Sequence, residues 1–159
     1  MIKITILAIG KIKESYFTAA IDEYRKRLSP HAKLEFVELS EEKTPDNPSA
    51  AERQAAVNEE GKKLLKRIPS GAYTFLLDLH GKEISSEELA AKLDKLQTAG
   101  NSQFCFIIGG PFGVSDELRA VSDCLSFSRL TFTHQMIRML LTEQIYRAFK
   151  INRGEKYHW

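Results

Sequence analysis

The sequence predicts an α/β fold with a mostly parallel sheet that carries helices on both faces. Two observations support this prediction. Short apolar runs rich in Ile, Leu, Val and Phe recur along the chain, and segments with helical periodicity separate them. Such alternation is typical of a parallel sheet, because each crossover helix returns the chain to the amino ends of the strands, so that the next strand runs in the same direction. At 159 residues the chain has the length of one domain, and we expect a single domain over residues 1–159.

Five strands are predicted where β-rich apolar runs stop at polar or glycine-containing segments. They cover residues 4–9, 34–39, 73–79, 104–108 and 124–128. In parallel sheets, ligands bind outside the carboxyl ends of the strands. The segments that follow these five strands are therefore the first places to look for a site.

Five helices are predicted between and after the strands, at residues 14–28, 50–68, 86–98, 116–121 and 133–151. Ser49 with Glu52 and Ser85 with Glu88 match the capping box, in which each side chain satisfies a free backbone N–H. Ser115 is placed to cap the fourth helix. The polar segment 40–49 reads as a loop within the domain.

Composition excludes several classes of protein. Hydrophobic residues make up 43% and charged residues 28%, which is ordinary for a soluble globular domain. No apolar run approaches the length of a membrane span, and the first residues do not resemble a signal peptide, so we expect a cytoplasmic protein without membrane contact. The two cysteines and four histidines lack metal-ligand spacing, so we expect free thiols at Cys105 and Cys124 and no metal.

The glycine pattern disfavours two common nucleotide-binding folds. Gly10, after the first strand, is followed by Lys11 to Glu14 and not by a GxGxxG loop, which argues against a Rossmann dehydrogenase or methyltransferase. Glu38 lies near the end of the second predicted strand, where a Rossmann fold has the acid that binds the ribose. Without the glycine loop that signal is weak. The segment 109–113, GGPFG, lacks the GK[ST] of a phosphate-binding P-loop.

The best candidate site lies in the C-terminal third. The glycines of segment 109–113 permit close approach of a ligand to the backbone, although a tight turn needs glycine equally. In segment 127–132, Phe127, Leu130 and Phe132 are suited to an apolar slot for an adenine ring, and Ser128 and Thr131 offer hydroxyls. An ordinary buried strand end is the alternative.

The last helix and the tail concentrate positive charge. Residues 129–159 carry six Lys or Arg against two Glu, which suits an anionic partner such as RNA but also a solvated helix face. Arg138, Arg147 and Lys150 share the predicted polar side, where Arg147 can also pair with Glu143. The chain closes on Tyr-His-Trp at 157–159. These side chains can stack on a base and move a proton, or simply pack.

Taken in order, the motifs resemble the RlmH family of ribosomal RNA methyltransferases, which are small members of the SPOUT superfamily. The resemblance rests on IGGPFG at 108–113, LSFSRLTFTHQMIRMLLTEQIYRAFKI at 125–151 and the terminal YH, and extends to ITILAIGKIKE and LLDLHGKEISSEELA. It implies one SPOUT domain over residues 1–159 with a C-terminal trefoil knot, and a homodimer. It also implies S-adenosyl-L-methionine as cofactor, held by Leu77, Gly109, Phe127, Ser128, Arg129, Leu130, Thr131 and Phe132.

The resemblance further implies a reaction. The expected substrate is a pseudouridine in the helix 69 loop of 23S ribosomal RNA, methylated at N3 on the assembled ribosome. His158 is then the candidate base or donor, Tyr157 a candidate for stacking or hydrogen bonding, and Arg138, Arg153 and Lys156 candidates for phosphate contacts. A non-catalytic ribosome-associated module that senses a nucleotide is the alternative. One departure is Thr133, where the family usually has proline, and its hydroxyl can cap the last helix.

Overall fold

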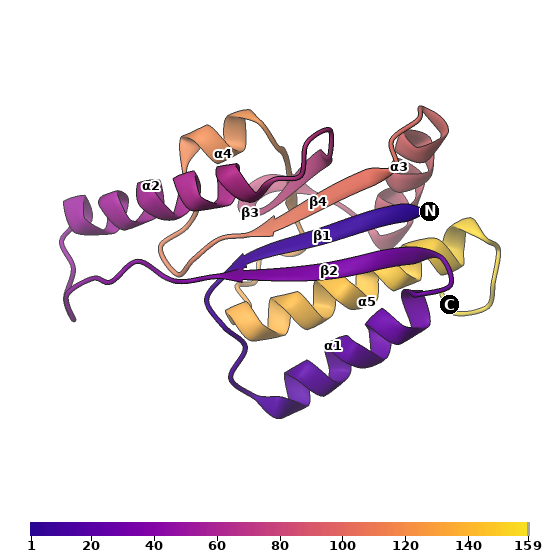
Figure 1. Ribbon diagram of the computed structural model, residues 1–159, viewed down its shortest axis with the longest axis horizontal. Coiled ribbons are helices and arrows are strands. Elements are labelled where there is room, and N and C mark those ends of the chain that lie inside the picture. The colour runs from indigo at the N-terminus through magenta and orange to yellow at the C-terminus, as the bar shows by residue number, and fades with distance from the viewer. Residues whose placement is uncertain (159) are drawn as a thin grey trace.

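In the computed structural model, which describes residues 1–158, five strands form one sheet in the order β2-β1-β4-β3-β5 (Figure 1). All four pairings are parallel, which confirms the predicted α/β class. The strands are β1 (Ile2–Ile9), β2 (Ala32–Leu39), β3 (Tyr73–Glu83), β4 (Gln103–Ile108) and β5 (Asp123–Ser126).

Four of the five described helices begin at the residues that the capping signals mark, whereas α1 begins after Glu14 without a side-chain cap. Ser49 and Ser85 each accept a hydrogen bond from the backbone N–H three residues on and complete a capping box. Ser115 and Thr133 cap the two helices that follow the glycine segment. The helices are α1 (Ser15–Leu28), α2 (Ala50–Arg67), α3 (Ser86–Thr98), α4 (Asp116–Ala120) and α5 (His134–Asn152).

Both faces of the sheet are buried, as a parallel sheet requires. Ile4, Ile6 and Ala8 of β1 join the core shared with α1, α3 and α5, whereas Leu7 and Ile9 join the core shared with α2 and α4. Figure 1 shows α2 and α4 on one side of the sheet and α1 and α5 on the other. The alternation of side chains along each strand thus sorts the helices into two layers.

Strand β3 is longer than predicted because it contains a bulge. Leu77 and Lys82 both pair with Leu125 of β5, so residues 78–81 leave the ladder between them. A Cβ on Gly81 would lie 2.7 Å from the carbonyl carbon of Cys124, so only glycine allows the strands to approach here. The bulge carries Asp78, Leu79 and His80 to the carboxyl edge of the sheet.

The described residues also bear on the expected chemistry of the cysteines and histidines. Cys105 and Cys124 are free thiols, and burial raises the pKa of Cys105 to about 12, which makes that thiol unreactive. Within residues 1–158, no group of three or more His, Cys, Asp or Glu side chains could hold a metal ion. None of the described helices is both long enough and apolar enough to span a membrane.

Candidate functional site

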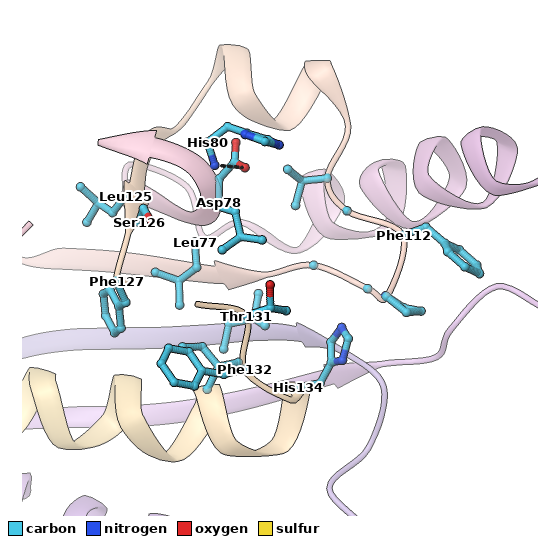
Figure 2. A pocket seen from close by; sticks show the side chains of 18 of the residues that line it. Leu77, Asp78, His80, Phe112, Leu125, Ser126, Phe127, Thr131, Phe132 and His134 are labelled. Atoms are coloured by element: carbon cyan, nitrogen blue, oxygen red, sulfur yellow. Dashed lines mark hydrogen bonds between the residues drawn. The ribbon is translucent and has the colours of Figure 1, made fainter. Parts of the chain in front are cut away.

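A cavity of about 420 Å³ opens at the carboxyl ends of β3, β4 and β5, beside the start of α5 (Figure 2). Its volume lies in the range of pockets that take small molecules and cofactors. Its walls come from the β3 bulge, the glycine segment 109–113, the segment 125–132, and a few side chains of α2, α4 and α5. The crossovers therefore bring together residues far apart in the sequence, as the sheet rule predicts.

The glycine segment is folded tightly against its surroundings. A Cβ on Gly109 would lie 2.6 Å from Cγ1 of Val114, and a Cβ on Gly110 would lie 2.5 Å from Oε1 of Glu60. Gly113 has a φ of +104° and donates its N–H to the Gly110 carbonyl at 3.3 Å. The turn itself thus needs these glycines, and the same turn leaves backbone along one wall of the cavity.

Segment 126–133 is shaped by its own hydroxyl groups. Ser126 Oγ donates to the Ser128 carbonyl at 3.0 Å, and Ser128 Oγ accepts the Leu130 N–H at 3.0 Å. Thr133 Oγ1 accepts the Met136 N–H at 3.3 Å, which starts α5. These bonds hold the chain after Ser126, where β5 ends, outside the strand ladder, and residues from it line the cavity.

The cavity gathers most of the residues that the resemblance assigns to the cofactor. Leu77, Gly109, Phe127, Ser128, Leu130, Thr131 and Phe132 all line it. Arg129 does not: its side chain is 92% exposed, with the guanidinium 3.8 Å from Glu83. Figure 2 shows Leu77, Thr131 and His134 around one space, although they come from β3, the segment after β5 and α5.

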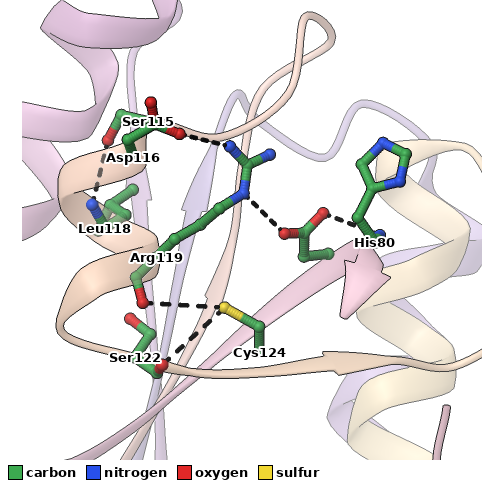
Figure 3. Close-up of polar contacts among 8 residues, drawn as sticks. His80, Ser115, Asp116, Leu118, Arg119, Ser122 and Cys124 are labelled. Carbon is green, nitrogen blue, oxygen red and sulfur yellow. Dashed lines mark hydrogen bonds and ion pairs between the residues drawn. The ribbon is translucent and has the colours of Figure 1, made fainter. Parts of the chain in front are cut away.

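One ion pair in the cavity wall was missed from the sequence. Arg119 of α4 donates from Nε to Asp78 Oδ2 at 2.8 Å, and its Nη1 lies 3.0 Å from Asp116 (Figure 3). The His80 N–H donates to the other oxygen of Asp78 at 3.1 Å. Burial alone would raise the pKa of Asp78, but these two hydrogen bonds hold it below its usual value, so Asp78 is a carboxylate. The pair fastens the β3 bulge to α4.

The only signal for that pair is weak. Gly81, an isolated glycine inside a strand pattern, is compatible with a bulge. Nothing in the spacing of the short helix α4 indicates that Arg119 faces the end of β3. The cavity residues Gln54, Val57, His134 and Ile137 were also missed, because their helical patterns do not show which strand end each helix meets.

The placement of Arg138 on the polar face of the last helix is wrong. Its side chain is 1% exposed; Nη2 donates to the Ile9 carbonyl at 2.7 Å, and Nη1 lies 3.2 Å from Glu38. This guanidinium is bonded inside the protein, so it does not present the exposed charge on which the expected phosphate contact was based. Glu38 is likewise held by Arg138 and by the Ile12 N–H at 2.8 Å, and it does not line the cavity.

The tail folds back along α5 and does not line the cavity. Tyr157 donates its hydroxyl to Glu143 at 3.0 Å, and its ring lies under the Arg147 guanidinium. The predicted Glu143–Arg147 pair is present at 2.6 Å. His158 lies between Arg147, 3.1 Å from Nδ1, and Glu87, 2.6 Å from Nε2. Trp159 lies outside the described residues.

The geometry around His158 fixes its hydrogen bonds. A guanidinium only donates and a carboxylate only accepts, so Nδ1 accepts from Arg147 and Nε2 carries the proton toward Glu87.

The pKa of Tyr157 is raised, chiefly because burial disfavours the charged phenolate and also because the hydroxyl is bonded to Tyr24 and Glu143. The hydroxyl therefore stays protonated.

The two remaining basic candidates are exposed. Arg153 is 57% exposed and pairs with Glu155 at 2.5 Å. Lys156 is exposed, and no ion pair forms at it within residues 1–158. Both lie at the end of α5 that is remote from the cavity, since His134 and Ile137 at the other end line it.

Comparison with known proteins gives one consistent set of relatives. The family model described as "Predicted SPOUT methyltransferase" matches residues 2–158. "Ribosomal RNA large subunit methyltransferase H" from Clostridioides difficile (strain 630) is 52% identical over 156 residues, 98% of both chains. The proteins of the same name from Alkaliphilus oremlandii and Halothermothrix orenii are 51% and 48% identical, each over 98% of this chain and 98% and 99% of their own.

Among solved structures, a probable methylase family protein from Haemophilus influenzae Rd KW20 has a similar fold. Its TM-score is 0.53 at 13% identity, over 98% of this chain and 70% of that one. At this identity the similarity concerns the fold alone.

Proposed function

The chain belongs to the SPOUT methyltransferase family, and from that premise we propose that it transfers a methyl group from S-adenosyl-L-methionine to large-subunit ribosomal RNA. The observation that carries the proposal is the cavity, where three separate loops meet at positions assigned to the methyl donor by the resemblance. The names of relatives about half identical over nearly the whole chain support the RNA substrate.

The residues of the cavity suit such a donor. Phe127, Phe132 and Leu77 offer apolar walls for an adenine ring, and the backbone of segments 109–113 and 127–132 can read its edge. When bound, the donor supplies an electrophilic methyl group on a positively charged sulfur. The protein's part is to hold that methyl in line with the acceptor nitrogen.

The finer proposal concerns the acceptor. It is N3 of a pseudouridine in the helix 69 loop of 23S RNA, on assembled ribosomes. This imide nitrogen must lose its proton to become nucleophilic, so a base, or donors to the flanking carbonyls, must stand beside it. His158 and Tyr157 are the candidates. As a base, His158 must first release Arg147 from Nδ1, the ring nitrogen that carries no proton, whereas Tyr157, with its raised pKa, serves as a hydrogen-bond donor.

The position of the tail bears on the oligomeric state. Neither Tyr157 nor His158 lines the cavity of its own chain. Their catalytic role therefore requires a second copy whose cavity faces this tail, which agrees with the homodimer that the resemblance implies. A trefoil knot through the C-terminal third belongs to the same proposal.

The test uses purified protein, tritiated methyl donor and three substrates: whole ribosomes, large subunits and free 23S RNA. The net charge of only +2 gives modest attraction to naked RNA, so we expect transfer to ribosomes and little to free RNA. Calorimetry should detect S-adenosylmethionine and neither NAD nor ATP. A nucleotide-sensing module would bind the donor without transferring its methyl group, and that result would exclude the catalytic proposal.

His158 can be tested in the same assay. His158→Ala should lower the transfer rate by at least about a hundredfold, a typical contribution of general base catalysis, with donor affinity unchanged. A rate within a few-fold of the parent protein, with the donor still bound, would show that His158 is not the base.

A further inference from the structure

The segment between β1 and α1, residues 10–14, has exposed charges on a fixed backbone. The Ile12 N–H donates to Glu38 Oε2 at 2.8 Å, and the N–H groups of Lys13 and Glu14 both donate to Gln135 Oε1, at 3.0 and 3.1 Å. Three successive amides are thus held by side chains of two other elements. A surface loop anchored in this way is already ordered before any partner arrives.

A buried arginine lies beneath this loop. Arg138 bonds both to the Ile9 carbonyl, just before the loop, and to Glu38, which accepts the Ile12 N–H. Removing a guanidinium from water is costly, and Arg138 Nε has no partner among the described residues. Desolvation lowers the pKa of Arg138, opposed by Glu38, yet the group stays charged because an arginine begins so high. Its bonds hold the loop, and the carboxylates of Glu38 and Glu41 lie close enough to balance its charge.

The side chains on this loop have the chemistry of an RNA contact. Lys11 and Lys13 are exposed, and neither forms an ion pair within residues 1–158. Tyr16, in the first turn of α1, is 65% exposed. Glu14 is the one acid in the segment. Ammonium groups contact phosphates without regard to sequence, and an exposed aromatic ring can stack on an unpaired base.

The loop also lies close to the cavity. Gln135, which holds the Lys13 and Glu14 amides, directly follows His134, which lines the cavity. An RNA strand whose target base reached the cavity would therefore have its backbone within reach of this loop.

We propose that residues 10–16 form a phosphate-binding surface for the RNA substrate, with Lys11 and Lys13 contacting the backbone and Arg138 acting as the residue that positions them. The inference rests on the proposed function, because it names how that substrate is held. It moves the phosphate contact from the buried Arg138 to the exposed lysines above it.

The first experiment compares two double variants that each remove two exposed lysines. Lys11→Gln/Lys13→Gln changes the proposed surface. The control is Lys33→Gln/Lys66→Gln, which changes lysines at the start of β2 and the end of α2, away from the carboxyl ends of the strands. We expect the first variant to raise KM for ribosomes roughly tenfold with kcat and donor affinity unchanged. The slope of log affinity against log salt should fall by about 1.4, two phosphates' worth. The control should match the parent protein.

Two results would overturn the proposal. One is a KM and salt slope for Lys11→Gln/Lys13→Gln that match those of the control. The other is a shift in oligomeric state, seen by light scattering, with ribosome affinity per dimer unchanged, which would assign this surface to a second copy. Binding to ribosomes is measured beside transfer. If the parent protein binds them without transferring methyl, the proposed function fails while the salt comparison still tests the surface.

The positioning role has its own readout. Gln135→Ala releases two loop amides without touching the core, and Arg138→Met removes the buried anchor. Each should raise KM for ribosomes, and adding Lys11→Gln/Lys13→Gln to Gln135→Ala should then cost clearly less than the product of the separate effects. Effects that multiply independently would show that the lysines do not depend on this anchoring. The KM of Arg138→Met is interpreted only together with its unfolding curve. If Arg138→Met does not fold, Gln135→Ala alone tests the positioning role.

Discussion

Glu60 of α2 is a buried carboxyl group directly beneath the glycine segment. Its Oε2 accepts the Glu42 N–H at 3.0 Å, but its Oε1 has no partner among the described residues and touches the position a Cβ of Gly110 would take. Desolvation raises the pKa of Glu60, and the Glu42 N–H only partly opposes this. The folded protein therefore binds a proton at Glu60 more tightly than the unfolded chain does.

That difference predicts a pH dependence of stability. An acid whose pKa is raised on folding contributes less stability as pH rises from its ordinary pKa through its folded one. Glu60→Gln should remove this loss, because an amide has no charge to desolvate, and should stabilise the protein at pH 7 by on the order of 1 kcal/mol, the free energy of about one pKa unit. Urea unfolding at pH 4 and pH 7 measures it. Glu59→Gln, one residue away and 55% exposed, is the control. Equal behaviour of the two variants would refute the account of Glu60.

The Asp78–Arg119 pair makes stability depend on pH in the direction opposite to that of Glu60. Because the folded-state pKa of Asp78 is lowered, its contribution is present above the ordinary aspartate pKa and is lost as pH falls through the folded value. Asp78→Asn should cost about 1 kcal/mol at pH 7, since Arg119 is partly exposed, and nothing near pH 2. Asp116→Asn, which removes a carboxylate that is 99% exposed from the same arginine, should stay within about 0.5 kcal/mol. Equal losses would mean that the bulge is not fastened by Asp78.

Among the elements, the start of α5 joins segment 127–132 to the helix whose first turn lines the cavity. Thr133 supplies the cap of this helix through its hydroxyl. Thr133→Ala should destabilise the protein by about 1 kcal/mol and weaken donor binding, because His134 and Ile137 lie in the first turn. Thr133→Ser keeps the accepting oxygen and should match the parent protein. If both variants bind the donor equally, the cap does not position this wall.

The elements themselves were predictable because their signals are local. Each capping residue named from the sequence marks a helix start in the structure, and the apolar runs form the five strands. What could not be predicted depends on contacts across the fold. Periodicity put Arg138 beside charged neighbours but could not show that the end of β1 lies opposite it. The β3 bulge arises from the approach of β5, which sequence spacing does not encode.

At the scale of the whole molecule, one chain does not bring its cavity and its tail together. If a partner's tail completes the site, then a dimer of His158→Ala with Gly109→Val should regain activity that neither variant has alone. Gly109→Val closes the glycine segment, because a Cβ there already meets Val114, and so removes the donor site. The intact cavity of the first chain then meets the intact tail of the second. No recovery in mixed dimers would show that the tail acts within its own chain.

Methyl transfer to the ribosome in the cell is measured directly by mass spectrometry of 23S ribosomal RNA from cells that lack this gene. We predict that one pseudouridine in the helix 69 loop loses one methyl group and regains it when the gene is restored, but not when His158→Ala is supplied. An unchanged methylation pattern in the deletion strain would contradict the account.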